Sequence, residues 1–224
     1  MPVDPDAPVL ISAFSWVPPF AQGKVRDLRV RWALEEAGIP YAVRKLDAMA
    51  ERPADYLAEQ PFGQVPTYRD KSVNLFESGA IVLHIGESCE ALLPSDPAAR
   101  ARAVTWAFAA LNSVEPTLME LVAIDVFNPG AAWGIERRPD VIARIEGRLD
   151  RLIDHLDDRD WLEDRFTAGD LLMTTVLRIL DGTDLVEKRP TLAAYKARGE
   201  ARPAFQRALA AQLADFEVRE PVAA

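Results

Sequence analysis

Two short groups of residues in the first half of the chain have the chemistry to hold a small charged ligand. Val65-Pro66 stands where a strand should begin, and an X-Pro bond is the peptide bond with ready access to the cis form. A cis-proline there would turn backbone N–H and C=O groups outward. Glu77-Ser78 stands where a helix should begin, so unpaired N–H groups and the positive end of the helix dipole lie in front of it. Together they predict a site for a small zwitterionic peptide.

The patterns around these groups predict the element order β-α-β-α-β-β-α. A β-α-β unit opens the chain, and its two strands should be parallel because a right-handed crossover joins them. Gly38 ends the first helix. The expected elements are a strand over 9–14, a helix over 20–37, a strand over 41–46, a weak helix over 49–59, and two strands followed by a helix within 62–81 and beyond.

The rest of the chain, after the connector Leu93–Pro97, shows helical periodicity and no strand signal. Thr167 and Asp170 have the spacing of a capping box, which predicts a folding role for both. We expect domains at 1–88 and 98–224, joined by a linker at 89–97. The expected segments of the second domain are helices over 98–124 (interrupted near Pro116), 140–157, 171–180, 190–198 and 203–215, with a loop over 127–139.

Composition excludes several classes of function. The net charge of -9 argues against a nucleic-acid partner, and 49% hydrophobic with 27% charged residues is typical of a soluble globular protein. No window approaches the roughly 18 uninterrupted apolar residues of a membrane span, and the N-terminus lacks the pattern of a signal peptide. Cys89 is the single cysteine, and two isolated histidines make no metal site. We therefore expect a cytoplasmic protein with no metal and no membrane partner.

Several separated motifs, in this order, resemble the cytosolic glutathione S-transferase family, including its bacterial glutathione transferase-like members. They are Gly63-Gln-Val-Pro66, Glu77-Ser-Gly-Ala-Ile81, Trp161-Leu162 before Phe166-Thr-Ala-Gly-Asp170, and Arg189-Pro-Thr-Leu-Ala-Ala-Tyr195 leading to Ala201-Arg-Pro-Ala-Phe205. The resemblance implies an α/β thioredoxin-like N-terminal domain followed by an all-α C-terminal domain, in a homodimer. It also implies a detoxification enzyme that conjugates the thiolate of its co-substrate, reduced glutathione, to a small apolar electrophile, without a metal.

The resemblance also assigns roles to the two groups of residues. By position, the backbone of Val65 would pair with the cysteinyl residue of glutathione, and Pro66 would be the cis-proline. Glu77 would bind the ammonium and Ser78 the carboxylate of the γ-glutamyl end, which agrees with a helix N-terminus as an anion site. Gln64 is an additional expected contact.

The segment from Ser15 to Lys24, which we call the thiol loop, departs from the family pattern because it contains neither tyrosine nor cysteine. A free thiol has a pKa of about 8.5, so a hydroxyl donor is needed to hold the thiolate at neutral pH. Ser15 is the expected catalytic group, with Ser12 a poorer candidate, and Trp16 and Lys24 are further expected contacts. Either of two triplets, 24–26 or 29–31, could match the family's basic Lys-Val-Arg triplet.

Other functions stay open at this level. A non-catalytic interaction protein of the same fold, or a glutathione-dependent isomerase, dehalogenase or peroxidase, would share the same motifs. Disulfide reduction is not expected, because Cys89 lies far from the thiol loop in this fold. An apolar pocket for the second substrate would draw on aromatic and apolar residues of the second domain, of which Phe127 and Trp133 are the better candidates: Trp106, Phe108, Met119, Phe127 and Trp133.

Overall fold

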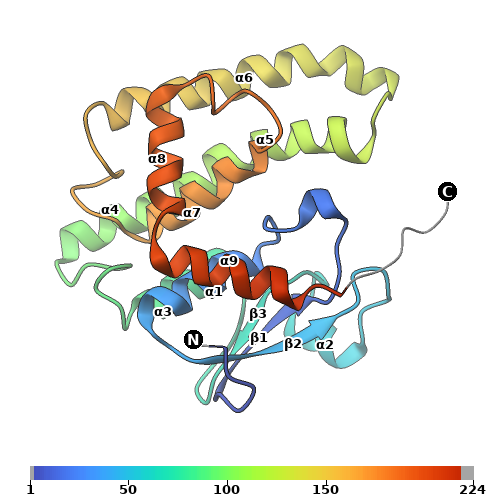
Figure 1. Cartoon of the computed structure of the whole chain (residues 1–224), viewed down its shortest axis with the longest axis vertical. Helices are drawn as coiled ribbons and strands as arrows, with labels where there is room; N and C mark the ends of the chain where they lie inside the picture. The colour runs from blue at the N-terminus through green and yellow to red at the C-terminus, as the bar shows by residue number, and fades with distance from the viewer. Residues whose placement is uncertain (1–2, 218–224) are drawn as a thin grey trace. The chain divides into compact units, whose positions relative to one another are not determined.

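The computed structural model describes residues 3–217, and these divide into two compact units (Figure 1). One unit is Glu90–Ala201, and the other joins the residues before it with those from Arg202 onward. The expected limits of 1–88 and 98–224 placed the last helix with the other helices, whereas its contacts group it with the first unit. Those domain limits therefore stay a prediction.

A four-stranded sheet in the order β2-β1-β3-β4 forms the centre of the first unit. β1 runs parallel to β2, while β3 is antiparallel to both β1 and β4. The elements are β1 (Val9–Phe14), α1 (Asp27–Ala37), β2 (Tyr41–Leu46), α2 (Ala54–Glu59), β3 (Thr67–Arg69), β4 (Asn74–Phe76) and α3 (Ser78–Gly86). This order confirms the predicted β-α-β-α-β-β-α arrangement.

Two helices of this unit begin later than predicted. α1 begins at Asp27 rather than at residue 20, and the residues before it form a 3₁₀ turn, η1 (Pro19–Ala21), followed by Gly23 at φ 75°. Prolines without N–H groups and a left-handed glycine cannot belong to one regular helix. α2 begins directly after Pro53 rather than at residue 49, because the residue before a proline is pushed out of the helical region.

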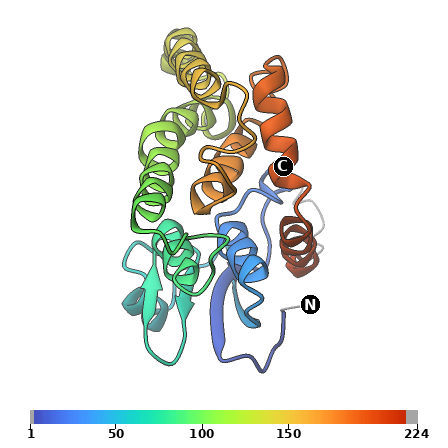
Figure 2. The same ribbon diagram turned by 90° about the vertical axis from the view of Figure 1, so that its left-hand side faces the viewer.

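The last helix, α9 (Pro203–Asp215), lies beside α1 (Figure 2). Arg31 Nε donates to Asp27 Oδ2 at 2.8 Å, and its Nη2 donates to Asp215 Oδ2 at 2.6 Å. Gln212 Nε2 donates to the other oxygen of Asp27 at 2.7 Å. Burial raises the pKa of Asp27, and the charge of Arg31 opposes that rise. Removing one partner of such a buried pair typically costs about 3–5 kcal/mol, so this cluster fixes α9 on α1.

The second unit opens with a nearly continuous helical stretch. It consists of α4 (Pro97–Phe108), η2 (Ala109–Val114), α5 (Glu115–Val122) and η3 (Ala123–Phe127), of which η2 and η3 are π-helical. The π-helical η2 ends at Val114, two residues before Pro116, so the predicted interruption near this proline is confirmed. By length and composition alone the stretch Pro97–Phe127 could cross a membrane, and 39% of its most apolar window is buried inside the protein. The core helix of a soluble protein meets the same test, so the expected absence of a membrane partner stays a prediction.

The predicted loop over 127–139 is wrong for most of its length. α6 (Ala132–Leu156) begins at Ala132 and contains Pro139. Proline removes one backbone donor and weakens the preceding turn, but apolar residues at three- and four-residue spacing bury the helix beyond it. Those buried residues are Val141, Ile145, Leu149, Leu152 and Leu156.

The capping box predicted at the start of α7 (Ala168–Leu177) is confirmed. Thr167 Oγ1 accepts from Gly169 N at 3.2 Å, and Asp170 Oδ2 accepts from Thr167 N at 2.9 Å. Asp170 Oδ1 also accepts from Leu162 N and from the hydroxyl of Tyr195. Burial raises the pKa of Asp170 to about 6, although these hydrogen bonds lower it. η4 (Arg178–Leu180) continues α7, and α8 (Pro190–Glu200) packs against α7.

We expect Gly199→Ala to lower the free energy of unfolding by about 1–3 kcal/mol, the usual cost of overpacking. A Cβ at this position would lie 2.5 Å from Thr174 Oγ1, which is inside van der Waals contact. Gly147→Ala is the control, because nothing lies within 4 Å of its Cβ and alanine favours a helix. Urea unfolding should show that Thr174→Ala relieves part of the Gly199→Ala loss; full additivity of the two substitutions would contradict the contact.

Candidate functional site

Three segments that are distant in the sequence leave the sheet at one end. In the β3–β4 pairing, Thr67, the first residue of β3, lies opposite Phe76, the last residue of β4. β1 is antiparallel to β3, and Ile11 lies opposite Tyr68. The last residues of β1 therefore lie level with the residues just before β3. The residues that follow β1, precede β3 and follow β4 therefore gather at one edge of the sheet, which we call the shared end.

Val65-Pro66 supplies the middle of the shared end, and its peptide bond is cis, as predicted. Val65 is buried, at 6% exposure, whereas Gln64 is exposed. Among the described residues, neither the N–H nor the C=O of Val65 makes a hydrogen bond. Buried backbone groups are nearly always paired, so this pair is suited to a ligand that offers one acceptor and one donor.

Glu77-Ser78 lies beside it, at the start of α3. Glu77 is exposed and caps the helix with φ 69° and ψ 110°, a region that residues other than glycine rarely adopt. Ser78 is 6% exposed, and its Oγ accepts from Nη1 of Arg29 at 3.3 Å. Because Arg29 fills an acceptor position of the hydroxyl, the O–H hydrogen of Ser78 stays free to point toward an anion. The first N–H groups of α3 and a buried guanidinium thus favour a carboxylate here.

Ser15 follows β1 and brings the thiol loop to the shared end. Its N–H donates to Leu46 O at 2.8 Å, and its C=O accepts from Glu217 N at 2.8 Å. The Ser15 side chain is 7% exposed, and Trp16 and Lys24 are partly buried in the same loop. The structure thus brings Ser15 to the same edge as Val65 and Glu77, while the roles predicted for Ser15, Trp16 and Lys24 stay predictions.

The alternative hydroxyl, Ser12, is excluded by its surroundings. It is fully buried in β1, and its Oγ already contacts Tyr56 Oη at 2.8 Å, Thr67 N at 2.7 Å and Thr67 Oγ1 at 3.0 Å. A serine hydroxyl has one hydrogen and two lone pairs, so these contacts use its full capacity. Of the two basic triplets, 29–31 lies in α1 and contains Arg29, which reaches Ser78, whereas 24–26 precedes the helix.

The sequence did not point to Arg52, which holds the loop before α2 against the shared end. Its Nε donates to Gly63 O at 2.9 Å, and its Nη1 donates to the carbonyls of Asp47 and Ala50 at 2.7 and 2.9 Å. An open hollow of about 550 Å³ lies against Arg52, Phe62 and Gly63. A single arginine in a polar loop carries no motif, so only the folded geometry identifies it.

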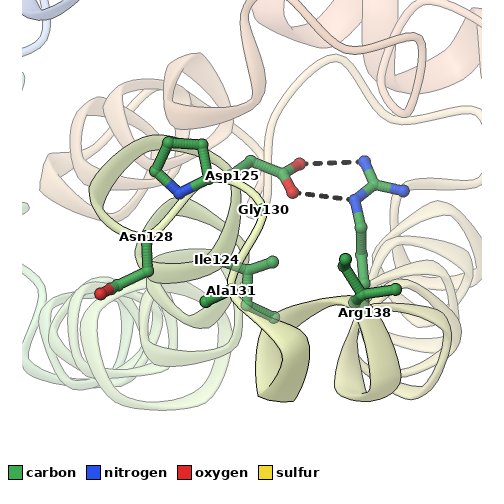
Figure 3. A pocket seen from close by; sticks show the side chains of 8 residues that line it. Ile124, Asp125, Asn128, Gly130, Ala131 and Arg138 are labelled. Atoms are coloured by element: carbon green, nitrogen blue, oxygen red, sulfur yellow. Dashed lines mark hydrogen bonds and ion pairs between the residues drawn. The ribbon is translucent and has the colours of Figure 1, made fainter.

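A second hollow lies in the other unit, where the hairpin between η3 and α6 turns (Figure 3). Its volume is about 280 Å³, and Asp125 faces Arg138 across it through two hydrogen bonds of 2.8 and 2.9 Å. Phe127 and Trp133, predicted to line a pocket, are 66% and 46% exposed and do not line this one. Their contact with a second substrate stays a prediction.

Two ionisable groups around the sheet, Asp70 and Tyr56, have shifted pKa values that favour the hydrogen bonds they make. Hydrogen bonds from Ser72 and Val73 lower the pKa of Asp70, which keeps the turn between β3 and β4 closed around a carboxylate. Burial raises the pKa of Tyr56, which keeps its hydroxyl protonated and able to donate. Within the part of the chain that the structure describes, no group of three or more His, Cys, Asp or Glu side chains is arranged to hold a metal ion.

Comparison with known proteins gives concordant matches. Residues 21–87 match the family described as Glutathione S-transferase, N-terminal domain. Glutathione S-transferase 3 of Zea mays is 30% identical over 200 residues, covering 82% of this chain and 88% of the relative. A serine-to-cysteine mutant of poplar glutathione transferase F1 has a TM-score of 0.78 at 23% identity, covering 93% of this chain and 99% of that one. A glutathione transferase from Burkholderia graminis, with two glutathione molecules bound per subunit, has a TM-score of 0.77 at 22% identity over 90% and 87% of the chains. The fold is therefore a thioredoxin-like domain combined with a helical region, as predicted.

We expect Glu77→Gly to raise the free energy of unfolding by about 0–2.5 kcal/mol. The left-handed backbone at Glu77 costs about 1–3 kcal/mol, and the entropy of glycine in the unfolded chain offsets about 0.5–1 kcal/mol of the relief. Urea unfolding measures the difference. Glu87→Gly is a matched control at the other end of α3, where φ is -57°, so this variant should be destabilised. Equal destabilisation of the two variants would show that Glu77 is not strained.

Proposed function

The chain belongs to the glutathione S-transferase family, and on this premise we propose that it binds reduced glutathione at the shared end and transfers the thiolate to an apolar electrophile. The observation that carries the proposal is the placement of the three predicted groups, Ser15, Val65 and Glu77, on neighbouring strand ends. β1 and β4 are separated by two strand spacings of about 4.8 Å. An extended tripeptide spans about 10 Å, which matches that separation.

The central, cysteinyl residue of the tripeptide would lie against Val65 at the shared end. Its N–H and C=O, unpaired among the described residues, would bond to the backbone of the cysteinyl residue, in the manner of a strand added to a sheet. The peptide bond between Val65 and Pro66 is cis, which agrees with the role that the resemblance implies for Pro66. The exposed side chain of Gln64 would provide a further polar contact.

The γ-glutamyl end carries an ammonium and a carboxylate, and each would meet its complement. The exposed carboxylate of Glu77 would bind the ammonium. Ser78 Oγ and the first N–H groups of α3 would bind the carboxylate, with the charge of Arg29 directly behind the serine. Such charge-assisted hydrogen bonds are about twice as strong as neutral ones, so this end should dominate the affinity.

The sulfur would lie toward the thiol loop, where Ser15 would donate a hydrogen bond to it, and Trp16 and Lys24 would complete its surroundings. A hydroxyl donor and a nearby cation both stabilise thiolate and lower the thiol pKa from its ordinary value of about 8.5. The thiolate then forms a C–S bond with the electrophilic carbon, which displaces a leaving group or opens a double bond. Positioning and thiolate stabilisation supply the catalysis, and glutathione is the co-substrate.

A non-catalytic interaction protein of the same family is the second candidate. Its support is the thiol loop, which is irregular from Ser15 to Lys24 except for the η1 turn and has no tyrosine or cysteine. A glutathione-dependent isomerase, dehalogenase or peroxidase would use the same glutathione contacts and differ in the pocket for the second substrate. We also propose a homodimer in the cytoplasm, acting without a nucleic acid or a membrane, on the family relationship and the acidic composition.

We expect the double variant Glu77→Ala/Ser78→Ala to lose retention on immobilised glutathione, because both charge-assisted contacts of the γ-glutamyl end disappear. The chain contains a matched control, the pair Glu87-Ser88, at the C-terminal end of the same helix. Glu87→Ala/Ser88→Ala should be retained like the unchanged protein. Calorimetry with millimolar glutathione adds a direct test: retention by both double variants would refute the site, and no heat with the unchanged protein would favour the interaction protein.

We expect Ser15→Ala to raise the pKa of the thiol of bound glutathione, because the thiolate loses its hydroxyl donor. The ultraviolet absorbance of the thiolate, followed against pH, should show that the thiol pKa rises by roughly one to two units. The dissociation constant of S-methylglutathione should change little, because its sulfur cannot ionise. If the thiol pKa stays the same in Ser15→Ala, another group activates the sulfur.

A further inference from the structure

A series of hydrogen-bonded, buried hydroxyl groups, which we call the hydroxyl chain, lies behind the backbone of Gln64 and Val65 at the shared end. Ser12 of β1, Tyr56 of α2 and Thr67 of β3 contribute the three hydroxyls, and the carbonyl of Gln64 ends the chain. Tyr56 is fully buried and packs in one apolar cluster with Leu46 and Val65. Three side chains from separate elements are therefore linked, and one of them, Tyr56, bonds to the residue that precedes Val65.

Counting hydrogens fixes the direction of every bond in this chain. A carbonyl oxygen only accepts, so the O–H of Tyr56 must donate to Gln64 O, and the two oxygens are 2.5 Å apart. Tyr56 has no second hydrogen, so Ser12 donates to Tyr56 Oη. Ser12 has then used its hydrogen, so both the N–H and the O–H of Thr67 donate to Ser12 Oγ. No alternative arrangement of hydrogens satisfies all these contacts.

The chain spans the cis-proline from both sides. It attaches to Gln64 before the Val65-Pro66 bond and to Thr67 after it. Val65 itself makes no main-chain hydrogen bond among the described residues, so the orientation of its free N–H and C=O depends on how its neighbours are held. Buried hydrogen bonds between consecutive hydroxyls also strengthen one another, which favours a single geometry.

We propose that the hydroxyl of Tyr56 is a positioning group for glutathione: by holding the carbonyl of Gln64 it aims the main-chain groups of Val65 at the ligand. This inference rests on the proposed function, because it concerns the same edge. The aromatic ring of Tyr56 fills the apolar cluster, and the hydroxyl alone connects that ring to the edge. Phenylalanine at this position would fill the cluster and leave the edge unattached.

Tyr56→Phe, studied in the full chain, tests this role. The dissociation constants of glutathione and of S-methylglutathione should both rise by about tenfold, as expected for losing one hydrogen bond that orders the edge. Equal losses for the two ligands are expected because the main-chain contact does not involve the thiol. In turnover with a general aromatic electrophile, the KM for glutathione should rise, while kcat at saturating glutathione should stay close to that of the unchanged protein.

Tyr195→Phe is the matched control. Tyr195 is also a buried tyrosine, and its hydroxyl donates to Asp170 Oδ1 at 3.0 Å, but it belongs to the other unit. It should lose stability and keep its affinity for glutathione within about twofold. Thr67→Val removes the far end of the hydroxyl chain and should weaken glutathione binding in the same direction but less, because Tyr56 still holds Gln64.

Hydrogen exchange supplies a measurement that needs no ligand. In Tyr56→Phe, the amide of Thr67, which donates to Ser12 Oγ, should exchange faster than in the unchanged protein, whereas Tyr195→Phe should leave its exchange unchanged. If the unchanged protein binds glutathione, and Tyr56→Phe binds it equally well with unaltered exchange, the positioning role is overturned. If the unchanged protein binds no glutathione, the proposed function fails; exchange alone then decides whether Tyr56 holds the edge.

Discussion

The register of β3 between β1 and β4 is the constraint on which the rest of the candidate site depends. β3 has only three residues, yet it aligns the cis-proline with the end of β4 on one side and with the end of β1 on the other. A shift by one residue would reverse the faces of its side chains and separate Thr67 from Ser12. The bond from Thr67 N to that buried hydroxyl therefore fixes the register as well as satisfying a donor.

The components of the edge could be predicted from sequence because their chemistry is local. A proline at the start of a strand and a Glu-Ser pair at the start of a helix have the same effect on the local backbone in any fold. What the sequence could not provide is their adjacency to Ser15, because that depends on strand pairing between residues far apart. The predicted start of α1, residue 20, is too early for a different reason: apolar periodicity continues through Gly23, although the φ of 75° at this glycine interrupts a helix.

Long-range polar contacts account for most of what sequence reasoning missed. Arg31 and Asp215, which join α1 to α9, are separated by 184 positions, and no local pattern relates them. Arg52 acts on backbone carbonyls, which carry no sequence identity. Ser12 lies close to the thiol loop in the sequence, but its hydrogen bonds to Tyr56 and Thr67 depend on how the three elements pack. Buried polar groups help to specify one structure through their hydrogen-bond partners, and the fold decides which partners they meet.

The two parts of the site are held by different portions of the chain. The backbone around Val65 is held by residues 12–67 of the first unit. The thiol loop is also attached to the C-terminal residues, because Glu217 N donates a hydrogen bond to Ser15 O. Asp215, two residues earlier, binds both Arg31 and Lys45, so that attachment is anchored to α1 and β2. With the proposed roles, affinity and reactivity would change independently: substitutions around Val65 would alter how tightly a peptide is held, and substitutions along α9 would alter the position of the thiol loop. Loops tolerate substitution better than the elements that they connect, so under this proposal the thiol loop could vary without disturbing the residues around Val65.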